Sequence, residues 1–281
     1  MQFTLPVVIS VRTVGGVCKS GIGTFVVVNK EGWIVTAAHI IKQISDATTA
    51  EALTRKLEAD AKKPPPLSLN RHERRKLAAA AKGPQPTNID KWSVWWGVDG
   101  AQLDPASIAM VDVADIAIGK LTGFDASKIS EFPVFKDPAN EFESGASLCR
   151  LGFPFYDVGT TFDPQKGFQL HNVPLPIFPN EGILSRMAEI ILVDQSGKFI
   201  ANPPFPLRMI ETSSAGIRGQ SGGPIFDENG VVWGIQSATT SYQMDLKTKE
   251  QQYYHVGVGV HTATILGLMK QQNIKFDVAS Y

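Results

Sequence analysis

Gly219-Gln220-Ser221-Gly222-Gly223-Pro224 is the stretch of sequence that decides the fold. It predicts a serine in a tight turn between a loop and a strand, because glycine reaches backbone conformations that are closed to other residues. A serine hydroxyl is a poor nucleophile alone: it needs a base to accept its proton and donors to hold the oxyanion that its attack creates. The N–H groups of Gly219 and Ser221 would converge on that oxygen. The turn therefore predicts a nucleophile whose base lies elsewhere in the chain.

Two other stretches contain a histidine and an aspartate suited to that chemistry. Gly32-Trp33-Ile34-Val35-Thr36-Ala37-Ala38-His39 places His39 just after an apolar strand, and a β-rich run begins at Asp112-Val113-Ala114-Asp115-Ile116-Ala117. Histidine exchanges a proton near neutral pH, and a buried carboxylate holds the imidazole in the right tautomer. Asp112 and Asp115 compete for the carboxylate role.

In the order His, Asp, Ser, these stretches resemble the trypsin-like (chymotrypsin-fold) serine proteases, closest to the HtrA-type protease domain. Residues supporting that branch are the run before His39 together with Gly23-Thr24-Phe25-Val26-Val27, Val98-Asp99-Gly100, and Thr212, nine residues before Ser221. The resemblance covers most of the chain outside roughly 44–90. It implies an all-β fold of two six-stranded antiparallel β-barrels with the active site in the cleft between them.

The resemblance also implies residue roles. His39, Asp115 and Ser221 would form the catalytic triad, since the family pattern places the aspartate directly before Ile-Ala and so selects Asp115 over Asp112. The backbone N–H groups of Gly219 and Ser221 would form the oxyanion hole. The substrate would be a protein or peptide, hydrolysed through an acyl-enzyme without a cofactor or a metal. The alternative function is a catalytically latent or inactive protease-like binding module.

A substrate pocket follows from the same resemblance. One wall would consist of Ala215 and Gly216, which offer no charge to a Lys or Arg side chain. The opposite wall would consist of Ser237, Ala238 and Thr239, with Gly259 from the last strand, and Thr239 would narrow the entrance. These residues predict a shallow apolar pocket for Val, Ala, Leu or Ile before the cleaved bond, because a buried unpaired cation would be costly there. Arg218 either favours acidic substrate residues or is simply solvated.

The lobes and an insertion can be assigned from the sequence. An N-terminal barrel, 1–125, would carry His39 and Asp115, and a C-terminal barrel, 126–281, would carry Ser221 and end in a helix, Thr262 to Gln272. Asp115 follows His39 by 76 positions, more than this fold usually needs, so 44–90 reads as a helical insertion. It predicts a helix from Ala50 to Lys63, a proline stretch, and a second, basic helix from Arg71 to Lys82. An autoinhibitory lid, a docking arm for a regulatory partner and a solvated helical hairpin are all compatible with it.

Composition excludes several classes of protein. Of 281 residues, 43% are hydrophobic, and 27 Lys and Arg balance 27 Asp and Glu, so no net charge directs the chain to nucleic acid or membrane. The basic part of the insertion has few interleaved aromatics, which disfavours nucleic acid further. Two cysteines and no secretory signal suit a cytoplasmic location. The chain leaves no room for the PDZ domain that usually follows an HtrA-type protease domain. The oligomeric state is left open.

Overall fold

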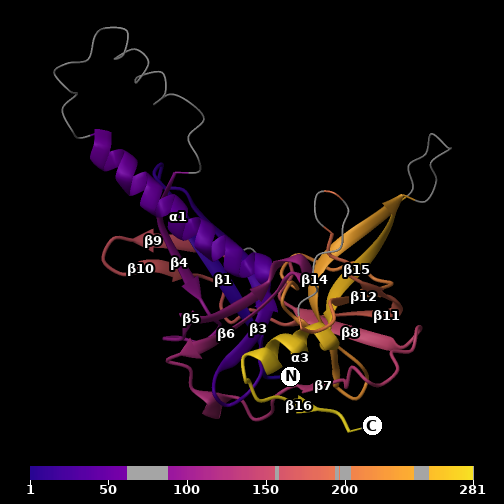
Figure 1. Ribbon diagram of the computed structural model, residues 1–281. Helices are drawn as coiled ribbons and strands as arrows, with labels where there is room; N and C mark the ends of the chain where they lie inside the picture. The colour runs from indigo at the N-terminus through magenta and orange to yellow at the C-terminus, as the bar shows by residue number, and fades with distance from the viewer. Residues whose placement is uncertain (62–87, 156–157, 194–195, 197–203, 244–252, 281) are drawn as a thin grey trace.

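The computed structural model describes residues 1–61, 88–155, 158–193, 196, 204–243 and 253–280 (Figure 1). Most of these residues belong to two curled antiparallel sheets that lie against each other, with one helix following the third strand and another near the C-terminus. This arrangement confirms the predicted trypsin-like double barrel. The main hydrophobic cluster draws buried residues from both sheets, including Phe25 and Ile118 from the first and Val232 and Val260 from the second.

The first sheet has six strands, in the order β4-β1-β2-β3-β6-β5. Its strands are rich in β-branched residues whose side chains point into the core, as in Ile34 and Ile118. Every pairing in it is antiparallel, and Ala37 at the end of β3 lies opposite Ile116 at the start of β6. The strands are β1 (Thr4–Thr13), β2 (Cys18–Val27), β3 (Trp33–Ala37), β4 (Ile89–Trp95), β5 (Gln102–Val111) and β6 (Ile116–Thr122).

Helix α1 (Ala38–Ala61) begins directly after β3, twelve residues earlier than the helix expected from Ala50. No glycine or proline interrupts 38–61, so the helix propagates from the end of the strand. Ile40, Ile41 and Ala47 are buried, whereas Leu53 and Leu57 farther along are exposed. Figure 1 shows the far end of α1 projecting away from the sheets. The proline stretch and the second expected helix lie outside the described residues.

The second sheet contains a closed ring of six strands. The order is β13-β8-β11-β12-β15-β14-β7-β16, and an additional pairing of β13 with β14 closes the first six into a barrel, while β7 and β16 add in parallel. The hairpin of β13 and β14 around Asp227–Gly230 is as expected from its turn sequence. The strands are β7 (Val134–Phe135), β8 (Ser147–Gly152), β11 (Phe178–Glu189), β12 (Arg208–Thr212), β13 (Pro224–Phe226), β14 (Val232–Gln243), β15 (Tyr253–His261) and β16 (Asp277–Val278).

Helix α3 (Thr262–Gln271) follows β15, within one residue of the predicted closing helix. Its N-cap is His261, whose Nδ1 accepts a hydrogen bond from Ala263 N at 2.8 Å. Burial, with smaller effects of Arg208 and Lys136, lowers the pKa of His261 to about 4, so the imidazole is neutral and suited to capping. A small separate hairpin consists of β9 (Thr160–Asp163) and β10 (Gly167–Leu170).

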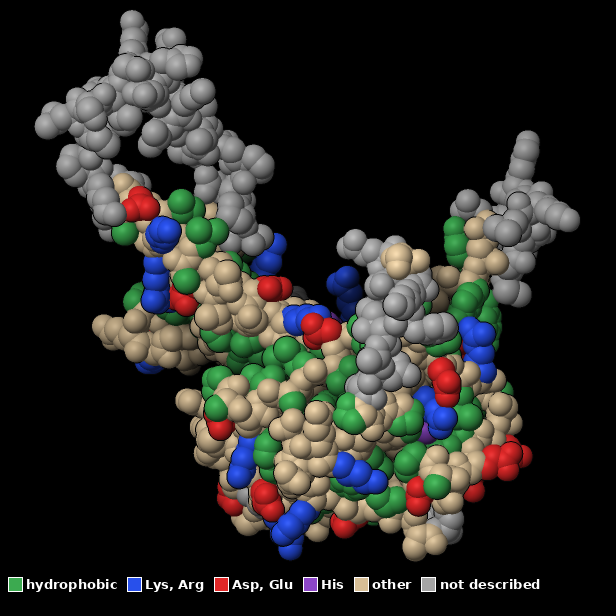
Figure 2. All heavy atoms as spheres, in the orientation of Figure 1, with side chains coloured by type: hydrophobic (Ala, Val, Ile, Leu, Met, Phe, Trp, Pro, Cys, Tyr) green, Lys and Arg blue, Asp and Glu red, His purple; other side chains and the backbone are tan. Residues whose placement is uncertain are grey.

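The surface agrees with the balanced composition. Figure 2 shows Lys and Arg side chains interspersed with Asp and Glu over the face in view, without a continuous patch of one sign. Of the helices that the structure describes, neither combines the length and the apolar character that crossing a membrane requires.

Candidate active site

The loop between η1 (Asp112–Ala114, a 3-10 turn) and β6 places Asp115 beside the start of α1. Asp115 has a left-handed backbone, with φ 53° and ψ 43°, and its carbonyl accepts a hydrogen bond from Ala38 N at 3.1 Å. Because β3 pairs with β6, the residue after β3 and the residue before β6 are neighbours. His39 and Asp115, 76 positions apart in sequence, are therefore brought together by strand pairing.

Three hydrogen bonds converge on the Asp115 carboxylate. His39 Nδ1 lies 2.8 Å from Oδ2, the His39 backbone N–H donates to Oδ1 at 2.8 Å, and Ser237 Oγ donates to Oδ2 at 2.6 Å. Burial raises the pKa of the Asp115 carboxyl, but the hydrogen bonds from His39 and Ser237 and the attraction to His39 outweigh it and lower the pKa below its usual value. The carboxylate is thus ionised at neutral pH and holds His39 by two contacts, one with the imidazole ring and one with the backbone N–H.

Asp112, the competing aspartate, lies away from His39. Its side chain is 58% exposed and forms an ion pair with Lys42, Oδ2 to Nζ, at 3.2 Å. The geometry therefore favours Asp115 as the partner of His39.

Ser237 connects the loop that carries Ser221 to this pair. Its Oγ binds Asp115, and its carbonyl oxygen accepts a hydrogen bond from Ser221 Oγ at 3.1 Å. The pairing of β14 with β15 shifts register between Gln236 and Ala238, so Ser237 is the extra residue of a β-bulge. A bulge residue leaves the strand ladder and re-aims its polar groups. Among the described residues, no hydrogen bond joins Ser221 Oγ to the His39 ring; the hydroxyl is directed to Ser237 instead.

Two glycines flank Ser221 at positions where the backbone leaves no room for a side chain. Gly222 has φ +84°, and a Cβ there would lie 1.9 Å from the carbonyl oxygen of Thr24; Gly219 has φ +93°, and its Cβ would lie 2.3 Å from the carbonyl oxygen of Phe153. The Gly219 carbonyl accepts from Phe153 N at 3.0 Å and so faces the protein. Within the described residues, the N–H groups of Gly219 and Ser221 donate to no acceptor. Both residues line a cavity, so their donors are available to a ligand.

Thr24 ties this turn to the first sheet, a role that its sequence position did not suggest. Its Oγ1 donates to Gly219 O at 2.6 Å, and its N–H donates to Ser221 O at 2.8 Å. The Thr24 carbonyl in turn accepts from Thr36 Oγ1 at 2.7 Å. A β2 residue thus fixes both ends of the Gly219–Ser221 segment.

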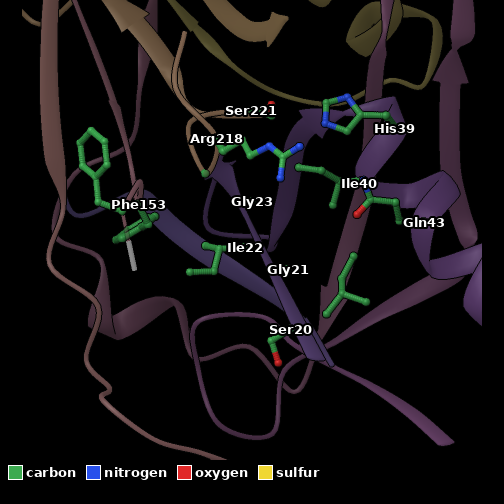
Figure 3. Close-up of a pocket in the computed structure, with 13 residues that line it drawn as sticks. Ser20, Gly21, Ile22, Gly23, His39, Ile40, Gln43, Phe153, Arg218 and Ser221 are labelled. Carbon is green, nitrogen blue, oxygen red and sulfur yellow. The ribbon is translucent and has the colours of Figure 1, made fainter. Parts of the chain in front are cut away.

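A cavity of about 680 Å³ opens beside His39 and Ser221. Figure 3 shows Arg218 extending over it toward Ile40, with Ile22 and Phe153 on the opposite side. Residues from both sheets form its walls: Ile9, Ser20, Gly21, Ile22, Gly23, Ile40 and Gln43 from the first sheet and α1, and Phe153, Phe155, Arg218 and Gly219 from the second. The cavity is large enough for one or two side chains of a peptide.

The residues predicted to line the substrate pocket do not all lie together. Of them, Arg218 lines this cavity, whereas Ala215, Gly216, Ser237, Ala238, Thr239 and Gly259 lie along the segment before Ser221 and on β14 and β15. Thr239 Oγ1 donates to Gly216 O at 2.8 Å, so these two walls are in contact. The glycine opposite Thr239 is Gly257; Gly259 lies opposite Gln236 and against the Ile225 side chain. Without the bulge at Ser237, Thr239 would lie opposite Val256, so the bulge is what brings Thr239 to Gly257.

Arg150 is a residue near this segment that sequence reasoning missed. It lies on β8, is only 1% exposed, and its Nη2 donates to Thr212 Oγ1, Ser214 O and Ser214 Oγ at 2.6–2.7 Å. The signal in the sequence is a single arginine in the apolar run Leu148-Cys149-Arg150-Leu151, at a position that alternation would turn inward. Among the described residues, no group of His, Cys, Asp and Glu could hold a metal ion.

Comparison with known proteins gives a family and a set of similar folds. Residues 23–235 match the model of the trypsin-like peptidase domain. Similar crystal structures include the Rv3671c protease from M. tuberculosis in its active form, 14% identical, with 98% of this chain and 83% of that chain covered and a TM-score of 0.48. The inactive form of that protease is 13% identical, with 94% and 87% covered and a TM-score of 0.42. No curated protein sequence matches the chain.

Proposed function

The chain belongs to the trypsin-like peptidase domain family, and from this premise we propose that it is a serine endopeptidase that hydrolyses peptide bonds through an acyl-enzyme. The observation that carries the proposal is the continuous hydrogen-bonded connection from His39 through Asp115 and Ser237 to Ser221. The substrate is a protein or peptide.

Each member of the triad has a distinct role in the proposed mechanism. Asp115 occupies the Nδ1 side of His39, which leaves Nε2 to act as the base. The Ser221 hydroxyl exchanges its hydrogen bond with the Ser237 carbonyl for one with Nε2, gives up its proton and attacks the substrate carbonyl. His39 then donates that proton to the leaving amine, and the same residues act with water to hydrolyse the acyl-enzyme.

The Gly219 and Ser221 N–H groups hold the oxyanion. The outward carbonyl of Gly219 would repel that charge, but here it is turned into the protein by Thr24 Oγ1 and Phe153 N, 2.6 and 3.0 Å away. The Gly219 N–H belongs to the Arg218–Gly219 peptide, and among the described residues neither it nor the Ser221 N–H donates to an acceptor, so both are free to bind the oxyanion.

The cavity beside Ser221 receives the part of the peptide that follows the cleaved bond and leaves first, as the amine product. Its apolar wall at Ile22, Ile40 and Phe153 suits apolar side chains, and Arg218 over its opening suits an acidic neighbour. Before the cleaved bond, the neutral residues Ala215 and Thr239 favour a small or medium apolar side chain over Lys or Arg.

A latent, protease-like binding module is the second candidate. The observation that favours it is the direction of the Ser221 hydroxyl, which donates to Ser237 O. If that arrangement persisted with substrate bound, His39 would have no proton to remove.

A fluorophosphonate probe distinguishes the two candidates, because it reacts with an activated serine alone. We expect labelling at Ser221, established by peptide mapping, and cleavage of a mixed peptide library, both lost in Ser221→Ala and His39→Ala. Ser241→Ala, on β14, is the matched control: its hydroxyl hydrogen-bonds to His255, and the variant should label normally. Stoichiometric peptide binding without labelling or cleavage would favour the latent module.

The insertion is proposed as a docking arm for a regulatory partner. Residues 44–61 of the insertion belong to α1, and exposed Leu53 and Leu57 on its projecting end are available for contact. We retain 1–125 and 126–281 as the two lobes of the chain.

A further inference from the structure

Arg150 is a buried cation without a counter-charge. Its side chain is 1% exposed, and its three hydrogen bonds go to the neutral acceptors Thr212 Oγ1, Ser214 O and Ser214 Oγ. The other terminal nitrogen, Nη1, is buried and has no hydrogen-bond partner among the residues that the structure describes. No ion pair in the described part of the chain includes Arg150. Buried charges in proteins are normally paired, because removing an ion from water is costly.

The guanidinium stays charged at neutral pH. Burial lowers its pKa to about 10, which remains well above the pH at which most enzymes work. A neutral side chain of the same length would fill this space at lower cost. The charge is therefore a feature that packing alone does not explain.

Arg150 lies against the segment that leads to Ser221. Ser214, whose carbonyl it binds, also accepts from Gly257 N at 2.9 Å. Gly257 stands opposite Thr239, two residues after the Ser237 carbonyl that binds the Ser221 hydroxyl. The cation is thus joined to the nucleophile region by a short path of backbone contacts.

Two glycines stand next to unusual nitrogen donors on this path. A Cβ on Gly257 would lie 2.4 Å from Arg150 Nη1, and a Cβ on Gly216 would lie 2.3 Å from Gln236 Nε2. Asn180, directly across from Arg150 on β11, donates to Ala215 O at 3.0 Å and holds the backbone beside Gly216. Gln236 Nε2 already donates to Ala238 O at 2.7 Å, so among the described residues Arg150 Nη1 is the donor without an acceptor behind the wall at which the residue before the cleaved bond was placed. Glycine leaves that wall without side chains.

We propose that Arg150 is a specificity-determining residue that accepts the carboxylate of a substrate side chain directly before the cleaved bond. This inference rests on the proposed function. The carboxylate supplies the charge that Arg150 lacks and the acceptor that Nη1 lacks. Because Nη1 is fully buried, a carboxylate reaches it only when the wall beside Gly257 moves aside, and glutamate extends farther from the peptide backbone than aspartate. The substrate class differs from the apolar one that the entrance residues Ala215 and Thr239 favour.

The test compares peptides that differ only at this position, carrying Glu, Gln, Asp, Val or Lys, by kcat/KM. We expect Glu to exceed its neutral isostere Gln about 10- to 100-fold, the effect of one hydrogen bond between charged partners. In Arg150→Met the ratio should fall to about 1, while cleavage of the Val peptide and the temperature of unfolding are retained. Arg186→Met removes an arginine of the same barrel that is already paired with Glu211, and it should keep the wild-type ratio.

The outcomes separate the inference from the proposed function. A wild-type enzyme that cleaves Gln or Val peptides as fast as Glu peptides would overturn the inference and leave the protease intact; this needs no variant to fold. Loss of stability in Arg150→Met with an unchanged Glu to Gln ratio would assign Arg150 a structural role only. Failure to cleave any peptide, with no probe labelling of Ser221, would overturn the proposed function and the inference with it.

Discussion

Ser237→Ala is the substitution that tests the electrostatics of the site most directly. It deletes the hydroxyl that donates to Asp115 Oδ2 at 2.6 Å, and it leaves the backbone carbonyl that receives the Ser221 hydroxyl. A hydrogen bond to a charged group contributes about 1.5–3 kcal/mol. The Asp115 side chain is 26% exposed, so solvent screens this contribution little. We expect the free energy of unfolding at pH 7 to fall by that amount.

The pH dependence identifies the source of the loss. Asp115 has a lowered pKa in the folded protein, so its stabilisation is fully present above the unfolded value of 3.8 and disappears as the pH falls through the folded value. Without the Ser237 hydroxyl, burial is opposed mainly by His39, and the folded pKa should rise. The difference between variant and wild type should therefore shrink toward about 1 kcal/mol or less, the value for a neutral hydrogen bond, as the pH falls through the folded pKa.

Urea titrations at pH 7, 5, 4, 3 and 2.5 measure this difference, with kcat/KM at pH 7 as a second readout. Ser241→Ala on the same strand is the control, since its hydroxyl meets the exposed His255. A loss in Ser237→Ala that is equally large at pH 7 and pH 2.5 would refute the reasoning, because the ionised carboxylate would then not be its source.

Three further predictions concern the site and its surroundings. Asp115→Asn should lower kcat about 10⁴-fold by favouring the wrong tautomer of His39, whereas Asp112→Asn should change it less than about threefold, because an exposed ion pair contributes little; steady-state kinetics of both variants decide between them. Gly222→Ala should destabilise the protein by more than about 3 kcal/mol, since its Cβ would meet the Thr24 carbonyl at 1.9 Å with φ at +84°, and Gly230→Ala, where the nearest atom is the end of Met1, should cost less in the same thermal unfolding assay. Replacing 58–87 by a Gly/Ser linker of equal length should leave kcat/KM on short peptides within about threefold, because the buried part of α1 is retained; a large loss with folding intact would mean that the segment helps to form the active site.

The sequence was sufficient to predict the double barrel and the approximate places of the strands. Glycine-flanked Ser221, the apolar run before His39 and the turn before Asp115 are local signals, and the strand pairing that joins them is common to the family. The closing hairpin at Asp227–Gly230 and helix α3 are likewise local, and the structure confirms both.

The features that sequence reasoning missed depend on contacts between distant strands. The bulge at Ser237 shifts β14 against β15 by one residue, so Thr239 lies opposite Gly257 and not opposite Val256. No local pattern in Gln236-Ser237-Ala238 specifies this extra residue. Composition near Ala50 predicts a helix that starts twelve residues later than α1, because it does not register the uninterrupted stretch from Ala38. Sequence alone does not identify Arg150, because an isolated charge in a strand is usually exposed and its burial depends on the tertiary structure.

Through Thr24, the position of Ser221 depends on how the two sheets pack against each other. His39 and Asp115 come from one sheet and Ser221 from the other, and two hydrogen bonds of a single β2 residue hold the Gly219–Ser221 segment in place. A rigid-body separation large enough to break those bonds could leave the second barrel, which is closed on itself, folded. Reactivity would then be lost while secondary structure persisted, so inactivation at mild denaturant concentrations would precede unfolding. Whatever pushes the sheets together or apart would act on catalysis without touching a catalytic group.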